Sequence, residues 1–112
     1  MATLFKKIID KEIPASIVYE DDLCLAFRDI NPQAPVHILV IPKITSIDKL
    51  SSAQPQHQSL LGHLLIKTQE IARAENLPDY RVVINNGEKA GQSVFHLHIH
   101  ILGGRDFSWP PG

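Results

Sequence analysis

Three histidines alternate with apolar residues in the segment 96–101, HLHIHI. Alternate residues of a β-strand share one face, whereas on a helix successive histidines at this spacing would lie about 200° apart. The pattern therefore predicts a strand, expected over 94–102, with an apolar face and a face of imidazoles. Gly103 and Gly104 are expected to end it.

The row His96, His98 and His100 predicts chemistry rather than surface decoration. Neighbouring histidines on one strand face lie about 6.6 Å apart at the backbone, so each responds to the charge of the next. Such a cluster can keep one imidazole neutral and nucleophilic while another stays cationic. The competing interpretation is a metal site that His37 completes.

The rest of the chain predicts an α+β fold. Strands are expected at 16–20 and 23–28, joined by a turn at Asp21-Asp22, and at 37–41 and 81–84. A short helix should start after Thr3 and end before Pro14, and one long helix should lie within 51–76. We expect a single domain over 1–112, with a mostly antiparallel five-stranded sheet and a C-terminal tail at 103–112.

The composition argues against binding of long nucleic acids, membrane insertion and secretion. Eleven Lys and Arg residues against 12 Asp and Glu give a net charge of −1, and the basic residues are scattered, so no surface for a long nucleic acid is expected. Cys24 is the single cysteine, which indicates a reducing compartment and a cytoplasmic location. No apolar run approaches the ~18 residues of a membrane span, so membrane insertion and secretion are not expected.

A glycine-bearing loop precedes the histidines, at 85–93. Gly87 and Gly91 permit positive φ, and Asn85, Gln92 and Ser93 offer side-chain hydrogen bonds, so the loop can form a nest for an anion. Such loops are also plain turns. The neighbouring histidines favour an anion site.

The segment 92–104, QSVFHLHIHILGG, resembles the signature of the histidine triad family. The resemblance extends to 5–15, 24–30, 32–35 with His37, 60–63 and the ending 109–112, and these segments are similar to the Hint branch, the nucleoside phosphoramidate hydrolases. It implies hydrolysis of purine nucleoside 5'-phosphoramidates of the adenosine 5'-monophosphoramidate type. The reaction would pass through a nucleotidyl-histidine intermediate and need no metal or other cofactor.

The resemblance also implies a role for each residue. His98 would be the nucleophile, with His96, His100 and His37 orienting it and stabilising the phosphoryl group. The predicted phosphate and leaving-group contacts are Asn85, Gly91, Gln92 and Ser93, with Ser93 near the departing amine.

The nucleoside would be held by residues that also have plainer interpretations. Asp29 would hold the ribose, although an Asx turn with Asn31-Pro32 explains it equally well. Phe5, Phe27 and Ile30 would line the base pocket, although the two phenylalanines are also expected as core residues. His57 and His63 are expected to be solvated or to pack on the helix.

The remaining expectations concern the oligomeric state, the departures from the family pattern and the physiological role. Hint proteins are homodimers whose C-terminal tail reaches the site of the other subunit, so Trp109 is a candidate for binding there, or it pins the tail to its own domain. The segment after Pro42-Lys43, up to Leu60, departs from the family pattern, so its contacts are expected to differ from those of the family. The pair Glu88-Lys89 also departs from it, and we expect an effect on leaving-group preference. A nucleotide-binding regulatory protein with incidental hydrolysis is the alternative function.

Overall fold

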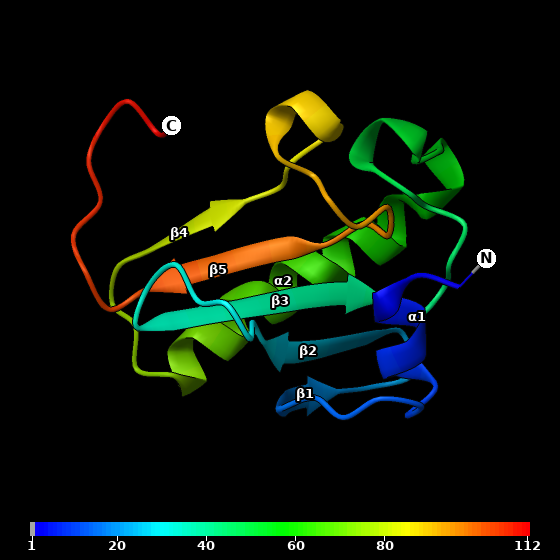
Figure 1. The fold of residues 1–112 in the computed structure, drawn as a ribbon, viewed down its shortest axis with the longest axis horizontal. Helices are drawn as coiled ribbons and strands as arrows, with labels where there is room; N and C mark the ends of the chain where they lie inside the picture. The colour runs from blue at the N-terminus through cyan, green and yellow to red at the C-terminus, as the bar shows by residue number, and fades with distance from the viewer. Residues whose placement is uncertain (1) are drawn as a thin grey trace.

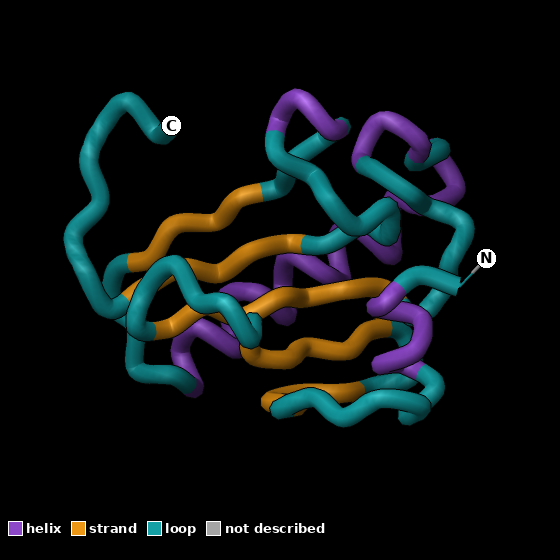
Figure 2. The backbone as a smooth tube through the Cα atoms, in the orientation of Figure 1, coloured by secondary structure: helices purple, strands orange, loops and turns teal. Residues whose placement is uncertain are grey.

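The computed structural model describes residues 2–112 and contains one five-stranded antiparallel sheet (Figures 1 and 2). The strand order is β1-β2-β3-β5-β4. The strands are β1 (Ile17–Glu20), β2 (Cys24–Arg28), β3 (Val36–Pro42), β4 (Tyr80–Val83) and β5 (Ile99–Gly103). The helices are α1 (Leu4–Ile9) and α2 (Gln58–Ala74), with short 3-10 turns at Leu50–Ser52, Pro55–His57 and Glu88–Ala90. The predicted α+β fold class is confirmed.

The two helices lie on opposite faces of the sheet, with α1 in front and α2 behind in Figure 1. Successive side chains of a strand point to opposite faces, so β2 and β3 feed two separate apolar clusters. Ala26 and Val40 pack with Leu64 of α2, while Phe27 and Leu39 pack with Phe5 of α1. A strand buried on both faces therefore carries a run of apolar residues, as β3 does after His37.

Local signals explain where the helices begin. Thr3 Oγ1 accepts a hydrogen bond from the Lys6 backbone N–H at 3.2 Å, which caps α1. α2 begins at Gln58, later than the expected limit of 51. Pro55 is the first residue of a 3-10 turn that leads into it, as expected of a residue without an N–H.

The expected strand over 94–102 is too long at its start, because β5 begins only at Ile99. The backbone N–H of Leu97 donates to Ile47 O at 2.9 Å, so this segment pairs with the 44–49 loop and not with a neighbouring strand. Among the three histidines of the motif, only His100 lies in the sheet, opposite Leu39 of β3 and Val83 of β4.

No helix among residues 2–112 is long and apolar enough to cross a membrane.

Candidate active site

A cleft of about 520 Å³ opens on the α1 side of the sheet. It lies between α1, the β2–β3 loop and the segment that leads into β5. The lining residues are Leu4, Phe5, Ile8, Ile13, Pro14, Ala15, Phe27, Arg28, Asp29, Ile30, Asn31, Gln33, His37, Leu39, Gly91, Ser93, Val94, His98 and His100. One part of the cleft is apolar and the other is built from imidazole, hydroxyl and backbone groups, a composition typical of small-molecule sites.

The apolar part is organised around Phe5 of α1. Its ring meets Phe27 edge-on at a centroid distance of 5.4 Å and His98 at 5.0 Å. Phe5 and Phe27 are both nearly fully buried, so they are core residues and cleft walls together. Ile30 is 96% exposed at the rim, where its side chain has no packing partner to hold it.

His98 is held in one tautomer. Its Nδ1 lies 2.7 Å from His96 O, and a carbonyl oxygen only accepts, so Nδ1 carries the proton and donates it. Nε2 of the neutral ring is then left with its lone pair. Because His98 lines the cleft, the structure presents an unprotonated imidazole nitrogen to any bound electrophile.

His37 and His100 form a second unit, and backbone geometry fixes both tautomers. The Gln33 backbone N–H donates to His37 Nδ1 at 3.0 Å, so His37 carries its proton on Nε2. That Nε2 lies 2.9 Å from His100 Nδ1 and 3.5 Å from Asp29 Oδ2. His100 therefore accepts at Nδ1 and carries its proton on Nε2. This Nε2 is a buried donor without a partner in the described chain.

Burial keeps the histidines neutral. Desolvation lowers the pKa of His37, His96 and His98 below the ordinary value. The pKa of His100 falls to about 4, because of desolvation first and then of the neighbouring His98 and His37. These lowered pKa values disfavour a cationic histidine in the resting cluster. The neutral Nε2–H of His100 is then the group that is free to donate a hydrogen bond.

His96 is set back from the cleft. Its Nε2–H donates to Pro42 O at 2.8 Å, which ties the histidine segment to the end of β3. The side chain is almost fully buried and its ring lies 6.1 Å from that of Phe5. His96 thus supports the backbone whose carbonyl orients His98.

The glycine-bearing loop divides into residues that reach the cleft and residues that shape the loop. Gly91, with φ of 99°, and Ser93 line the cleft. The Gln92 side chain is buried, accepts from Gly87 N and donates to Asp48 O and Val94 O. Asn85 lies behind Gly91, where its amide nitrogen would be 3.7 Å from an added Cβ. The structure therefore gives Gln92 a position that stabilises the loop, and it places the Asn85 amide beside Gly91.

The two carboxylate oxygens of Asp29 have different surroundings, one in a turn and one in the cleft. Its Oδ1 accepts from the Asn31 backbone N–H at 2.8 Å, which is the expected Asx turn. Its Oδ2 remains near His37 and in the cleft, so it can still accept hydrogen bonds from a ligand.

Trp109 is 82% exposed and lines no part of the cleft of its own chain. Its expected place in a partner's site stays a prediction.

Several cleft residues escaped the sequence interpretation. Leu39, Ile8 and Val94 line the cleft, and Gln33 orients His37 through its backbone. The apolar face of α1 was the only sequence signal for Ile8. A backbone N–H leaves no trace in residue type, so the role of Gln33 has no signal in the sequence.

Among residues 2–112, two groups of side chains have the composition of a metal site. Asp29, His37 and His100 bring one ligand atom each within 4.8 Å of one another, and so do Asp21, Cys24 and His63. In the second group, Asp21 already accepts from Tyr19, His63 and two backbone N–H groups. Burial also raises the pKa of Cys24 to about 12, which disfavours the thiolate that a metal needs.

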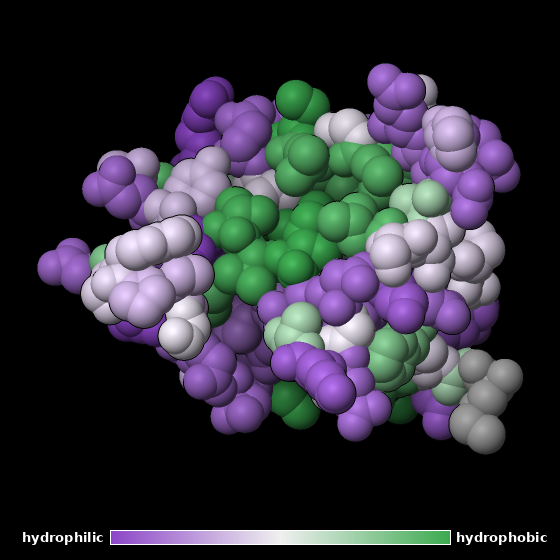
Figure 3. Space-filling model, turned by 90° about the horizontal axis from the view of Figure 1, so that it is seen from above, coloured by the Kyte–Doolittle hydropathy of each residue, from purple (hydrophilic) through white to green (hydrophobic). Residues whose placement is uncertain are grey.

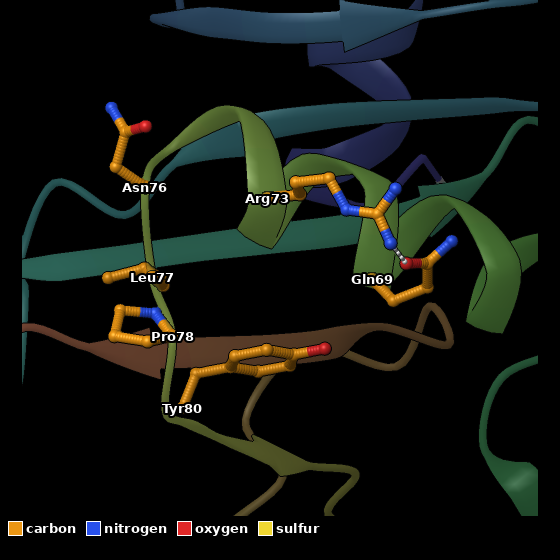
Figure 4. Close-up of a pocket in the computed structure, with 6 residues that line it drawn as sticks. All are labelled: Gln69, Arg73, Asn76, Leu77, Pro78 and Tyr80. Carbon is orange, nitrogen blue, oxygen red and sulfur yellow. Dashed lines mark hydrogen bonds between the residues drawn. The ribbon is translucent and has the colours of Figure 1, made fainter.

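A separate hollow of about 500 Å³ lies where α2 ends (Figure 4). It is lined by Gln69, Arg73, Asn76, Leu77, Pro78 and Tyr80, and Arg73 donates to Gln69 Oε1 at 3.2 Å. None of these residues lines the histidine cleft. The residues that line the hollow include no histidine, serine, cysteine or carboxylate, so the cleft is the candidate active site.

Several known proteins are similar to this chain in sequence and in fold. The HIT domain model matches residues 10–107. An uncharacterized HIT-like protein of Synechocystis sp. is 64% identical over 111 residues, covering 98% of this chain and 96% of that one. The 14 kDa zinc-binding protein of Zea mays is 55% identical, covering 98% and 88%. The crystal structure of a HIT family hydrolase from Legionella pneumophila superimposes with a TM-score of 0.95 at 47% identity, covering 99% and 100%.

Proposed function

The chain belongs to the HIT domain family, and we propose that it is a nucleoside phosphoramidate hydrolase of the Hint branch. The observation that carries the proposal is the tautomer of His98. Its Nδ1–H is bound to His96 O, which leaves the Nε2 lone pair available in the cleft. A neutral imidazole in this state needs no separate base to become a nucleophile.

The proposed reaction has two displacements at phosphorus. His98 Nε2 forms a bond to phosphorus while the bond from phosphorus to the leaving amine nitrogen breaks, and the amine leaves with a proton that it takes from solvent through the Ser93 hydroxyl. Water then attacks the nucleotidyl-histidine and returns one proton to solvent, which releases the nucleoside monophosphate and restores neutral His98. Splitting one difficult substitution into two steps is the usual benefit of covalent catalysis.

Groups around His98 match the charge that develops on the phosphoryl oxygens. His100, whose Nε2–H has no partner in the described chain, lines the same cleft as Ser93 and Gly91. Fixed donors in a partly dehydrated site stabilise such charge without reorganisation. A bound anion would also raise the pKa of His100, which would let that ring deliver a proton. Ser93 is the group we assign to the departing amine.

The two-part cleft supports the substrate class that the family resemblance implies. A purine is flat and apolar enough to lie in the part lined by Phe5, Ile8, Phe27 and Leu39. Asp29 lies between that part and the histidines and can accept from ribose hydroxyls. We therefore propose adenosine 5'-phosphoramidates and related purine compounds as substrates, with a nucleoside monophosphate as product.

The test is a rapid-quench experiment with adenosine 5'-phosphoramidate. We expect an acid-labile nucleotidyl adduct on His98, and turnover in His98→Ala lowered by several orders of magnitude with nucleotide binding retained. His57→Ala, outside the cleft, is the matched control and should retain turnover. An adduct on another residue, or full activity of His98→Ala, would contradict the mechanism. Faster turnover of dinucleoside polyphosphates would contradict the substrate class.

We further propose a homodimer. β4 is an edge strand, and Val82 on it is exposed, as are Leu65 and Ile66 of α2. Figure 3, which views the molecule from the β4 side, shows apolar residues gathered on this face. An unpaired strand edge beside apolar side chains favours pairing with a second copy. Trp109 would then reach the site of the partner subunit.

Metal binding is the second candidate, because Asp29, His37 and His100 form a set of ligand atoms in the cleft. The Zea mays relative carries the name of a zinc-binding protein. A metal would have to replace the His37–His100 hydrogen bond, so it would compete with the proposed catalytic state. Turnover that persists after chelation supports hydrolysis without metal, whereas strict zinc dependence would overturn it. A regulatory nucleotide-binding role in the cytoplasm stays a prediction from the sequence.

A further inference from the structure

We propose that Arg105, in the C-terminal segment after β5, is a positioning residue that holds the imidazoles of His37 and His100 in their working tautomers through the backbone of Gln33. The inference rests on the proposed function, since it names what orients the proposed phosphate donor. Arg105 itself lies outside the cleft.

The first step is the contact between Arg105 and the β2–β3 loop. Its Nε and one Nη donate to Gln33 O at 3.3 and 3.2 Å, and the other Nη donates to Asp106 O at 3.0 Å. Two donors of one planar guanidinium on a single oxygen fix both the position and the direction of that carbonyl. The contact joins segments 72 residues apart.

The second step runs through Gln33 to the histidines. The N–H of the same residue donates to His37 Nδ1, so the residue that Arg105 clamps is the one that sets the His37 tautomer. His37 Nε2–H donates in turn to His100 Nδ1, which leaves the proton of His100 on Nε2. Loss of the N–H from Gln33 would allow His37 to place its proton on Nδ1 and reverse this order.

The clamp is built into a rigid support. The Arg105 guanidinium lies 4.2 Å from the centroid of Phe107, and Arg81 of β4 lies 5.1 Å from the same ring. Arg81 also donates to Ser108 O at 2.9 Å, which fastens the tail to the sheet. Stacking of arginine on an aromatic ring restricts the guanidinium to the plane it needs for the Gln33 contact.

The turn directly after β5, at Gly104, packs against the same β2–β3 loop. Gly104 has φ of 90°, and a Cβ there would lie 2.9 Å from Pro35 Cβ. Residues after β5 are therefore packed tightly on the β2–β3 loop at two points, Pro35 and Gln33. Such double support is what a hydrogen-bonded pair of neutral imidazoles requires, because each ring can otherwise turn or exchange its proton.

The direct test is ¹⁵N nuclear magnetic resonance of histidine-labelled protein, which distinguishes Nδ1–H from Nε2–H rings. In the wild type we expect Nε2–H for His37 and His100 and Nδ1–H for His98. Arg105→Ala should give mixed tautomers at His37 and His100 and leave His98 unchanged. With an adenosine phosphoramidate, kcat should fall about tenfold at a nearly constant KM, below the ~100-fold that misplacing a reacting group by 1 Å can cost.

Matched variants separate geometry from charge. Arg105→Lys keeps the charge but loses the planar fork, so it should resemble Arg105→Ala in the spectrum and in kcat. Phe107→Ala leaves Arg105 in place and removes its stacking, so a smaller shift in the same direction is expected. Arg73→Ala removes an exposed guanidinium from the end of α2 and should match the wild type.

Each result decides the proposal. Wild-type tautomers in Arg105→Ala would overturn it, and so would an Arg105→Lys protein that behaves as the wild type in both measurements, since charge alone would then explain the effect. The spectrum does not depend on turnover. A wild type that fails to hydrolyse phosphoramidates but shows the tautomer change in Arg105→Ala would refute the proposed function and keep the positioning role of Arg105.

Discussion

Acidification should destabilise this protein through His100, and His100→Gln should remove much of that sensitivity. The pKa of His100 is lowered to about 4 in the folded protein, against an ordinary value of 6.5. Between these values the unfolded chain binds more protons than the folded one. The stability contributed by the neutral buried ring is therefore complete above about pH 6.5, is lost as the pH falls, and changes little further below about pH 4.

The size of the effect follows from the two pKa values. From pH 7 to pH 5 this single group would cost about 2 kcal/mol of unfolding free energy, and partial solvent access to the ring reduces this to about 1 kcal/mol. His37, His96 and His98 act in the same direction, because their pKa values are lowered as well. They are present in both proteins, so the comparison with His100→Gln isolates the His100 contribution.

The assay is urea unfolding at pH 7, 6 and 5, at one protein concentration because an oligomer would make stability concentration-dependent. The wild type should lose about 1 kcal/mol more than His100→Gln between pH 7 and pH 5. His57→Gln controls for the removal of a histidine outside the cleft. Parallel losses in the wild type and His100→Gln would refute the argument that burial keeps this ring neutral.

Four further predictions concern the loop, the core, the assembly and the C-terminal tail. Gly91→Ala places a Cβ at φ of 99° without a close contact, so we expect about 1 kcal/mol of backbone strain and lower turnover, measured by urea unfolding and an activity assay; unchanged values would contradict it. Leu64→Ala in the fully buried contact of α2 with the sheet should cost about 3 kcal/mol by urea unfolding, and a cost below about 1 kcal/mol would show that the site collapses. The wild type should sediment as a dimer and Val82→Asp as a monomer, and a monomeric wild type would refute the interface. Deletion of 109–112 should change turnover or leaving-group preference more than stability, and an unaltered substrate profile would count against a tail near the site.

The sequence by itself determined the elements of the fold. Alternating apolar residues, Thr3 as a cap, and Pro55 near the start of the long helix act over a few residues, so β2, β3, α1 and α2 could be placed from local patterns. The histidine motif also predicted a strand over 94–102, of which the part from Ile99 onward is present as β5. It failed over 94–98, because the Leu97 N–H finds its partner in Ile47, a contact that no strand periodicity reports.

The tertiary structure alone decided which histidines face the cleft and which nitrogen of each ring carries the proton. His96 and His98 differ by two positions in one motif, yet one is bound to Pro42 O outside the cleft and the other faces it. The tautomers of His37 and His100 depend on the backbone N–H of Gln33, and the carbonyl of the same residue accepts hydrogen bonds from Arg105, 72 residues further along the chain. Hydrogen-bond partners set the proton positions of neutral imidazoles, and here those partners come from segments that only folding brings together, so residue type and spacing cannot encode them.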